Sequence, residues 1–491
     1  MDVSVSEFYT DKTVFITGGS GFIGKVLVEK LLRCCPVRKI FLLMRPKKGG
    51  SLKARYHELI RSRAFDNIRQ DPLIFEKLHL IRGDILQENL GMSDADRQLV
   101  QEETNIVFHS AACVKFDMFI RDAVQMNVVG TRRVLELVEG IHNLDVFVHL
   151  STTYCRSDLP LLEEKVYPSK HNPDDVIHLT KWMDDGVLKH LEPKLIEPEP
   201  NTYGYTKSLA EQIVAEFSGK FPICIARPSI VVAALKEPFP GWVDNINGPT
   251  AIIVGASKGV IRSMLCDDQQ NGDGMPVDQV VNGCVLLAYT TALTQATSKE
   301  LVVCNIARAG INSISWGEAV EIAKTHIKEF PPSVALWYPG GSPKRHKMQH
   351  DIAVLFTHLL PAYLVDFILQ LAGKKPFLVN VQKRVTSGLG VIQYYAIRPW
   401  KFSNQRYLAL RSQISEDEDR LFYTDIKSMD WQSYMKEYVR GSREYCCKED
   451  PATLQQAKAL HSKLFFADLL LKLTLWTWCL YILYLGLKYI V

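Results

Sequence analysis

Short apolar runs alternate with stretches of helical periodicity over the first 150 residues. Apolar residues at helical spacing follow the first run, over 22–34, and separate the last two runs, over about 121–139. The runs are rich in β-branched and aromatic residues, which is typical of buried strands: 13–17, 39–44, 78–81, 106–109 and 146–150. This alternation predicts an α/β fold, a doubly wound parallel sheet of the Rossmann type.

Beyond residue 150 the pattern becomes less regular. Residues 157–200 form a long insertion with several prolines, many charges and no clear period. It is either a surface excursion or part of a lid over a substrate. A further strand, bent at Arg227-Pro228, is predicted across 223–225 and 229–232, and a shorter α/β segment begins near 301.

A stretch rich in proline, glycine and basic residues at 331–347 predicts a domain boundary. Residues 353–372 beyond it are strongly apolar but contain Pro361, Asp366 and Gln370, which favours a pair of core helices over a membrane span. Two domains are predicted, a larger one at 1–345 and a smaller, mainly helical one at 346–450.

The C-terminal run 469–487 is apolar apart from Lys472. Its charge-free part, 473–487, would be about 22 Å long as a helix. The hydrocarbon core of a bilayer is about 30 Å thick, a length that the whole run approaches if Lys472 snorkels. Tryptophans and tyrosines in or beside the run resemble interfacial anchors. We therefore predict a membrane helix at 465–489; a helix lying in the interface and a core helix are the alternatives.

The ends of the chain bear on the compartment. The N-terminus lacks a basic start followed by an apolar core, so no signal peptide is expected. The C-terminal Lys-Tyr-Ile-Val is neither an SKL nor a KDEL type of address. The expectation is a C-terminally anchored protein whose catalytic domain faces the cytosol, on the endoplasmic reticulum or the peroxisome.

The composition excludes several classes. A chain of 491 residues with 47% hydrophobic and 23% charged residues is globular rather than disordered. A net charge of +4 without a long basic block does not suggest nucleic acid as a partner. The eleven cysteines lack CxxC spacing, which indicates reduced thiols, and we expect no metal site.

The sequence TGGSGFIG, with Gly18, Gly21 and Gly24, stands between the first strand and the first helix. Glycine permits a tight turn and lets backbone N–H groups approach a pyrophosphate at the positive end of the helix. This position in a strand–turn–helix unit predicts a dinucleotide site.

The residues after the second strand indicate which dinucleotide is used. An NAD site usually has an acidic residue there, whereas this chain has Arg45, followed by Lys47 and Lys48. A guanidinium pairs with a 2′-phosphate that a carboxylate would repel, so NADPH is favoured. Asp84, after the third strand, could accept a hydrogen bond from the adenine amine, or simply belong to a turn.

Tyr203 and Lys207 form a YxxxK motif after the fifth strand, which runs into Ser151 and Thr152. The spacing alone is common, but one helical turn would place Tyr203 and Lys207 on the same face. Tyr205 has no lysine four residues on. Hydride arriving at a carbonyl carbon leaves negative charge on oxygen, which needs a donor and finally a proton. We expect Lys207 to lower the pKa of Tyr203, and a hydroxyl of Thr152 or Ser151 to orient the carbonyl.

These motifs, in this order, resemble those of the extended short-chain dehydrogenase/reductases. The resemblance implies that Asn127 holds a water that relays protons to Lys207, and that Ala111 lines the cofactor cleft. The insertion lengthens the gap before Tyr203, which leaves the choice among Ser151, Thr152 and Thr153 less certain; Thr152 is preferred.

The run from Glu237 to Pro249, EPFPGWVDNINGP, resembles the signature of the fatty acyl-CoA reductases, as do NTYGYTKSLAE and VFHSAACVKFD. That family implies NADPH-dependent reduction of a long-chain acyl-CoA to a primary alcohol by two hydride transfers through an aldehyde, with CoA released. It also implies a C-terminal "sterile" domain. Trp242 in this run would touch the substrate, or simply pack in a structural loop.

The resemblance assigns the remaining sites. Catalysis falls to Thr152, Tyr203, Lys207 and Asn127, and substrate contacts to Ser151 and Trp242. The cofactor-binding residues are Gly18, Ser20, Gly21, Phe22, Ile23, Gly24, Arg45, Asp84, Ile85, Ala111, Lys207 and Pro228. The alternatives are a membrane-bound steroid or sugar-nucleotide dehydrogenase of the same superfamily, and a non-catalytic scaffold. The sequence predicts neither the preferred acyl chain nor the oligomeric state.

Overall fold

The computed structural model describes residues 3–46, 50–295 and 298–490. The chain divides into two compact units that do not follow its order. Unit 1 comprises Met1–Pro240, Asp273–Ser313 and Trp400–Met429, and unit 2 comprises Gly241–Gly272, Ile314–Pro399 and Asp430–Val491. The boundaries predicted near 345 and 450 stay a prediction.

Unit 1 is built on a seven-stranded parallel sheet, which confirms the predicted fold class. The strands lie in the order β11 (Val302–Ile306), β6 (Ile223–Pro228), β5 (Val146–Leu150), β4 (Ile106–His109), β1 (Thr13–Thr17), β2 (Lys39–Met44) and β3 (Leu78–Arg82). In the centre, Ile16 lies opposite Leu42 on one side and Phe108 on the other. The central strands are buried on both faces, which explains their continuous apolar runs.

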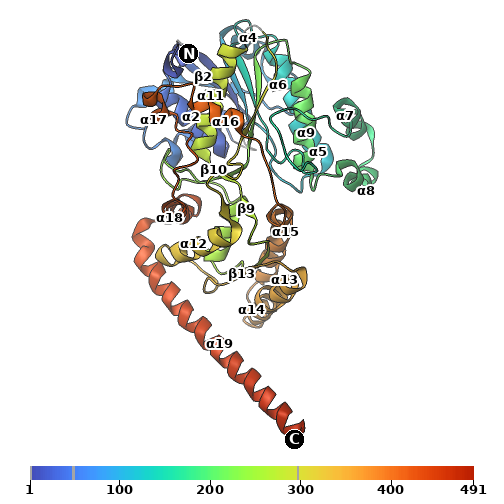
Figure 1. Ribbon diagram of the computed structural model, residues 1–491, viewed down its shortest axis with the longest axis vertical. Coiled ribbons are helices and arrows are strands. Elements are labelled where there is room, and N and C mark those ends of the chain that lie inside the picture. The colour runs from blue at the N-terminus through green and yellow to red at the C-terminus, as the bar shows by residue number, and fades with distance from the viewer. Residues whose placement is uncertain (1–2, 47–49, 296–297, 491) are drawn as a thin grey trace. The chain divides into compact units, whose positions relative to one another are not determined.

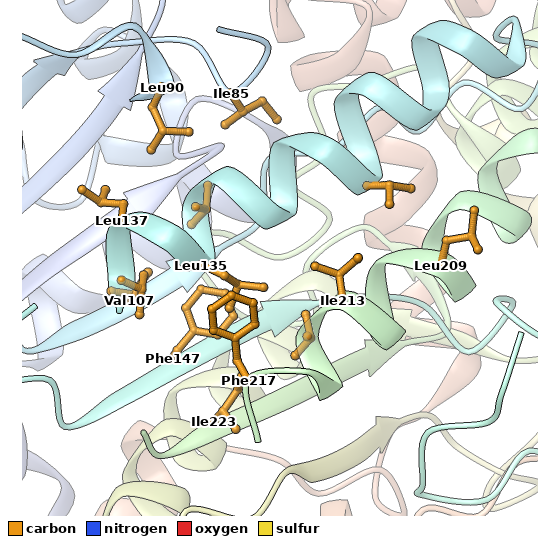
Figure 2. Close-up of a cluster of buried hydrophobic side chains, with 14 of the residues drawn as sticks. Ile85, Leu90, Val107, Leu135, Leu137, Phe147, Leu209, Ile213, Phe217 and Ile223 are labelled. Carbon is orange, nitrogen blue, oxygen red and sulfur yellow. The ribbon is translucent and has the colours of Figure 1, made fainter. Parts of the chain in front are cut away.

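Helices cover both faces of the sheet (Figure 1). On one face, α2 (Phe22–Cys34) packs against α11 (Val277–Thr294); on the other, α6 (Gly130–Val138) packs against α9 (Thr202–Ala215). Figure 2 shows the core beneath α6 and α9, where buried apolar side chains from the strands and helices meet: Ile85, Leu90, Val107, Leu135, Leu137, Phe147, Leu209, Ile213, Phe217 and Ile223. Full burial of one such side chain stabilises the fold by about 1.5–3 kcal/mol.

The insertion at 157–200 contains two helices that its irregular pattern did not predict. Helix α7 (Pro173–Trp182) begins at the N-cap Asn172, and α8 (Asp185–Ile196) at the N-cap Asp184. Both pack against α5 (Ile120–Val124), and α7 also contacts α9. Each helix is short and buries only two or three side chains, so its period is weak in the sequence.

The remaining regular elements of unit 1 are short. They are α1 (Val5–Tyr9), α3 (Leu52–Ile60), α4 (Asp94–Glu103), a π turn η4 (Gln125–Val129), β7 (Ile230–Val232), β10 (Gly274–Pro276), α16 (Gln405–Arg411) and α17 (Glu416–Leu421).

Unit 2 is mainly helical. Its helices are α10 (Gly248–Ser257), α12 (Trp316–Glu329), α13 (Lys347–Val354), the π turn η5 (Leu355–Leu359), α14 (Leu360–Leu371), α15 (Leu378–Ala396), α18 (Trp431–Gly441), the π turn η6 (Ser442–Cys446) and α19 (Leu454–Ile490). Short strands pair in twos: β8 (Ser263–Leu265) with β13 (Ser342–Lys344), and β9 (Asn271–Gly272) with β12 (Ile314–Ser315).

Among the described residues, two helical segments are long and apolar enough to cross a membrane, Lys347–Leu371 and Pro451–Leu485. The second includes residues 465–485 of the predicted membrane helix, and the whole of 465–489 lies in the continuous 37-residue helix α19. The first was expected to form a core helix pair, and that expectation is wrong: only 17% of its most apolar part is buried. Hydrophobicity alone does not distinguish a buried helix from one that faces another apolar medium.

Candidate active site

The predicted site residues of unit 1 come from the carboxyl ends of six strands, from the start of α2, from α9 and, for Asn127, from η4. In an open parallel sheet, ligands bind at this edge, where the strand order reverses. The reversal lies between β1 and β4. Residues follow the strands in this way: Gly18 after β1, Arg45 after β2, Asp84 after β3, Ala111 after β4, Ser151 and Thr152 after β5, with Pro228 closing β6.

The loop from Gly18 to Gly24 forms a close-fitting cradle. Gly18 has a positive φ of 77°, and a Cβ there would lie 2.7 Å from the amide nitrogen of Ala111. A Cβ at Gly24 would overlap the carbonyl oxygen of Gly18. Gly21 is the N-cap of α2 and offers no side chain to the first N–H groups of that helix. Phe22 and Ile23 form its first turn, and the first N–H groups of a helix point outward from its positive end, where an anion can bind.

Two arginines lie beside this cradle. Arg45 pairs with Asp84 at 3.3 Å, and Arg55 of α3 donates to the hydroxyl of Ser20 at 2.9 Å and to the carbonyl of Arg45. Burial and the nearby charge of Arg45 lower the pKa of Arg55. Two guanidinium groups beside a phosphate-binding loop favour a second phosphate there. Arg55 was not predicted, and the predicted basic residues Lys47 and Lys48 lie outside the described residues.

Tyr203 and Thr152 are hydrogen-bonded to each other. Tyr203 is the second residue of α9, which begins at the N-cap Asn201. Burial raises the pKa of Tyr203 above its ordinary value, and the hydrogen bond with Thr152 acts in the opposite direction. The outcome differs from the lowering expected from Lys207, because removing a phenolate from water outweighs the hydrogen bond. Tyr203 is therefore protonated at neutral pH, as a proton donor must be.

Lys207 is buried one turn beyond Tyr203. Its ammonium group donates a hydrogen bond of 2.6 Å to the carbonyl of Leu150, the last residue of β5. Burial lowers the pKa of Lys207 to about 8, while the charge of Glu211 raises it. A lysine with this pKa carries a positive charge at neutral pH and loses it under mildly basic conditions.

Asn127 lies in the π turn η4 and is buried. Its side-chain oxygen accepts from the amide of Cys113 at 2.8 Å, and its amide nitrogen donates to the carbonyl of Cys113 at 3.2 Å and to the hydroxyl of Thr206 at 2.9 Å. The residue thus joins the loop after β4 to the helix that carries Lys207. Its predicted water-relay role stays a prediction.

An ion pair that the sequence analysis missed lies behind Lys207. Glu211, one turn further along α9, binds the buried Arg227 through two hydrogen bonds of 2.7 and 2.5 Å. Arg227 also donates to the carbonyls of Glu163 and Lys165 in the insertion. The sequence shows a glutamate four residues after Lys207, on the same face of the helix, but it does not show that the partner of this glutamate comes from β6.

The hydroxyls next to Thr152 differ in their surroundings. Among the described residues, the buried side-chain oxygens of Ser151 and Thr153 have no hydrogen-bond partner. Tyr205, the other tyrosine of the motif, is 2.9 Å from the Nδ1 atom of His171 in the insertion. Two of the predicted cofactor-binding residues take part in hydrogen bonds through their carbonyl groups. The carbonyl of Pro228 accepts from the amide of Thr153 at 3.1 Å, and the carbonyl of Ile85 accepts from Arg133 at 3.0 Å.

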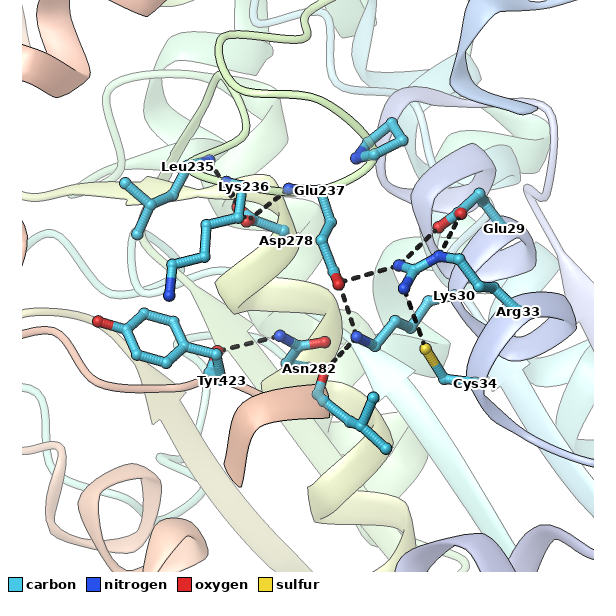
Figure 3. Close-up of polar contacts among 12 residues, drawn as sticks. Glu29, Lys30, Arg33, Cys34, Leu235, Lys236, Glu237, Asp278, Asn282 and Tyr423 are labelled. Atoms are coloured by element: carbon cyan, nitrogen blue, oxygen red, sulfur yellow. Dashed lines mark hydrogen bonds and ion pairs between the residues drawn. The ribbon is translucent and has the colours of Figure 1, made fainter. Parts of the chain in front are cut away.

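The segment that begins at Glu237 is attached to α2 (Figure 3). The Glu237 carboxylate lies 2.6 Å from the ammonium of Lys30 and 3.0 Å from the guanidinium of Arg33. The buried carboxylate of Asp278 accepts hydrogen bonds from the three amides of 235–237. These contacts fix the start of the segment to α2, which follows the glycine loop, and to α11, which carries Asp278.

The rest of this segment belongs to unit 2. Gly241 has a positive φ of 75°, and a Cβ there would overlap the carbonyl of Glu437 in α18. Trp242 is only 1% exposed. Unit 1 therefore brings together all the predicted site residues except Trp242, whose substrate role stays a prediction. Within the described ranges, no group of three or more His, Cys, Asp or Glu side chains could hold a metal ion.

Comparison with known proteins places this site in a family. A family model described as "Male sterility protein", for an NAD-binding domain, matches residues 16–284, and a second "Male sterility protein" model, Sterile, matches residues 357–449. Fatty acyl-CoA reductase 1 of Mus musculus is 34% identical over 464 residues, which cover 94% of this chain and 90% of that protein. The chain belongs to the fatty acyl-CoA reductase family.

One further relative agrees with the assignment to the fatty acyl-CoA reductase family, and one solved structure shares the fold. A putative fatty acyl-CoA reductase of Drosophila melanogaster, CG8306, is 36% identical over 96% of this chain and 93% of its own length. The reductase domain of a nonribosomal peptide synthetase from Mycobacterium tuberculosis has a similar fold, with a TM-score of 0.57 and 17% identity over 87% of this chain and 91% of its own. Membership of the fatty acyl-CoA reductase family indicates that the protein is an oxidoreductase with a nicotinamide-dinucleotide-binding domain.

Proposed function

We propose that this chain reduces long-chain fatty acyl-CoA to a primary fatty alcohol with NADPH, through an aldehyde and by two hydride transfers, with release of CoA. The observation that carries the proposal is the arrangement of Thr152, Tyr203 and Lys207 at the carboxyl edge of the sheet, next to the glycine cradle. The family membership supplies the substrate class, because the relatives bear the name fatty acyl-CoA reductase.

The residues beside the cradle fit NADPH. When bound, NADPH supplies hydride to the carbonyl carbon. The backbone N–H groups at the start of α2 would hold its pyrophosphate, and the Gly18–Ala111 approach leaves the loop no room for a side chain. Arg45 and Arg55 would bind the 2′-phosphate in bidentate fashion, which favours NADPH over NADH. Asp84 forms an ion pair with Arg45, so its carboxylate is less available for a hydrogen bond with the adenine.

The catalytic residues have separate tasks. Tyr203, kept protonated by burial, donates a hydrogen bond and then a proton to the oxygen that becomes negative. Thr152, hydrogen-bonded to Tyr203, and Ser151, whose hydroxyl has no partner within the described part of the chain, orient the carbonyl. Lys207 supplies a positive charge that favours the phenolate left after proton transfer. Asn127 fixes the loop after β4 and, by our proposal, supports proton resupply to Lys207.

The apolar tail fits a lipid substrate. Helix α19 carries exposed leucine, tryptophan and tyrosine side chains, and Lys472 in it is paired with Asp468 at 2.6 Å. We propose that α19 anchors the protein in the membrane with the catalytic unit on the cytosolic side, on the endoplasmic reticulum or the peroxisome. Long acyl chains partition into that membrane, so the anchor would keep enzyme and substrate together.

The proposal is tested with the detergent-solubilised full-length protein. It is incubated with NADPH and palmitoyl-CoA or stearoyl-CoA, and the extracted lipids are identified by mass spectrometry. We expect the fatty alcohol of matching chain length from the wild type and from Tyr205→Phe, and none from Tyr203→Phe. Turnover of a steroid or a sugar nucleotide, without turnover of any acyl-CoA, would contradict the proposal.

A further inference from the structure

The segment Lys347–Leu371 of unit 2, which runs through α13, η5 and α14, carries a continuous row of exposed apolar side chains. They recur every three or four residues, as one face of a helix requires, and each is 44–74% exposed. We call these residues the apolar stripe: Met348, Ile352, Leu355, Phe356, Leu360, Tyr363, Leu364, Phe367, Ile368 and Leu371. Contiguous apolar surfaces of this kind mark sites of contact with a protein or a membrane.

Three polar side chains of the same segment face the protein, whereas its exposed polar side chains lie near its two ends. His350 lies 2.9 Å from the hydroxyl of Ser263, and the Nε2 atom of His358 accepts a hydrogen bond of 2.9 Å from the amide of Arg262. Both histidines are buried, as is Asp366. A surface helix of a water-soluble domain has the opposite arrangement, with its apolar side inward. The polarity of the middle of this segment is therefore inverted, which indicates that the medium outside it is apolar.

Asp366 completes this arrangement. It is the only Asp, Glu, Lys or Arg between Asp351 and Lys374. Its carboxylate accepts three hydrogen bonds of 2.9 Å from the amides of 377–379, at the start of α15. Backbone donors at a helix start have no partner within the helix, and in hydrocarbon each unsatisfied group costs several kcal/mol. The one charge in the apolar segment thus satisfies the donors that the α14–α15 turn would otherwise expose.

The segment α13–η5–α14 and the following helix α15 form a helical hairpin, and both of its ends return to the same part of unit 2. Before α13, β13 pairs with β8, and at the end of α15 the carbonyl of Ala396 accepts from the amide of Asp267, two residues beyond β8. One compact unit therefore holds both ends of the hairpin, which fits a stripe that lies along one face of an apolar medium rather than across it. Basic residues stand at both ends of the stripe, at 344–347 and at 374–375, where they would meet anionic lipid headgroups.

We propose that the apolar stripe inserts into one leaflet of the bilayer as a second, non-spanning membrane contact of the protein. The inference rests on the proposed anchoring by α19, which belongs to the same compact unit and presents its own exposed apolar residues. A bilayer is favoured over a second copy of the chain because the stripe is flanked by basic residues at both ends and accompanies a helix long enough to cross a membrane.

The test is photocrosslinking of the full-length chain in vesicles of equimolar phosphatidylcholine and phosphatidylserine. A benzophenone amino acid replaces Phe356, Leu364 or Phe367 of the stripe. The matched control is Val334, which is apolar, 73% exposed and in the same unit but outside the stripe, and Trp478 of α19 reports on the anchor. NADPH binding and the thermal midpoint of each variant in detergent establish that it is folded.

Adducts with phospholipid acyl chains at all three stripe positions and at Trp478, at least tenfold above Val334, are expected. Lipid adducts at Trp478 but only background at the stripe would overturn this inference and leave the anchoring proposal standing. Background at Trp478 as well would overturn both. Crosslinks between two copies of the chain at the stripe, without lipid adducts, would assign the surface to self-association and overturn the inference.

Discussion

The ammonium group of Lys207 donates a hydrogen bond of 2.6 Å to the carbonyl of Leu150. This contact joins α9, which carries Tyr203, to the end of β5, from which Thr152 follows two residues later. The positions of Tyr203, the proposed proton donor, and of Thr152 therefore depend on one buried lysine. A change at Lys207 is expected to affect both the chemistry and the pH dependence of folding.

Replacement of Lys207 by methionine should change how stability depends on pH. Burial lowers the pKa of Lys207 to about 8 from 10.5, so between these values the unfolded chain binds a proton that the folded chain does not. The wild type should accordingly gain up to about 3 kcal/mol of unfolding free energy relative to Lys207→Met as the pH rises from 8 to 10.5. Urea unfolding of both proteins across this range measures the difference. If the unfolding free energies of the two proteins changed in parallel with pH, the lowered pKa of Lys207 would be contradicted.

Removal of the Tyr203 hydroxyl should abolish most of the activity while the cofactor still binds. General acid catalysis contributes about 10²–10⁴-fold, so kcat of Tyr203→Phe should fall by this factor with little change in the KM for NADPH. Tyr205→Phe is the matched control, because its hydroxyl pairs with His171. Steady-state kinetics of both variants decide the point; equal losses in the two would mean that the hydroxyls act only through the stability of α9.

Arg55, which lies beside Ser20 and Arg45, should determine the choice between NADPH and NADH. Loss of a charge-assisted hydrogen bond costs about 1.5–3 kcal/mol, so Arg55→Ala should raise the KM for NADPH by roughly 10- to 100-fold. The KM for NADH should stay within about twofold, since NADH has no 2′-phosphate to lose. Arg61→Ala, an exposed change at the end of the same helix, should alter neither value. An equal rise in the KM for NADPH and for NADH would show that Arg55 does not bind the 2′-phosphate specifically.

Gly24→Ala should weaken cofactor binding because the added Cβ would overlap the carbonyl of Gly18. The loop must then move away from α2, and the backbone donors lose their alignment. The control is Gly388→Ala in α15, where an added Cβ would have no neighbour within 4 Å outside the nearby backbone of its own helix. This change should leave the free energy of unfolding unchanged or raise it by about 0.5–1 kcal/mol. Fluorescence titration with NADPH and thermal unfolding compare the two. Unchanged affinity in Gly24→Ala would show that the cradle is not needed.

The sheet and the core of the site were predictable because their signals are local. Each central strand is one continuous apolar run, and the glycine loop and the Tyr203–Lys207 spacing each lie within eight residues. A parallel sheet then brings the ends of its strands to one edge, so Thr152, Ala111 and the glycines meet without any long-range information in the sequence.

The features that were missed depend on contacts between distant segments. Arg55 reaches Ser20 across 35 residues, and Arg227 joins Glu211 from another element, so no spacing marks either pair. The exposure of the apolar stripe was missed for a different reason. Hydrophobicity reports how a side chain partitions, and it does not tell whether protein or lipid surrounds it.

The most direct test of the central claim is the ratio of NADPH consumed to alcohol formed from palmitoyl-CoA by the purified full-length protein. We expect two NADPH oxidised and one CoA released per hexadecanol, with little aldehyde captured by an added trapping amine. One NADPH per product, with free hexadecanal accumulating, would mean that the site performs only the first reduction. Oxidation of NADPH without any CoA release would contradict the proposed reaction altogether.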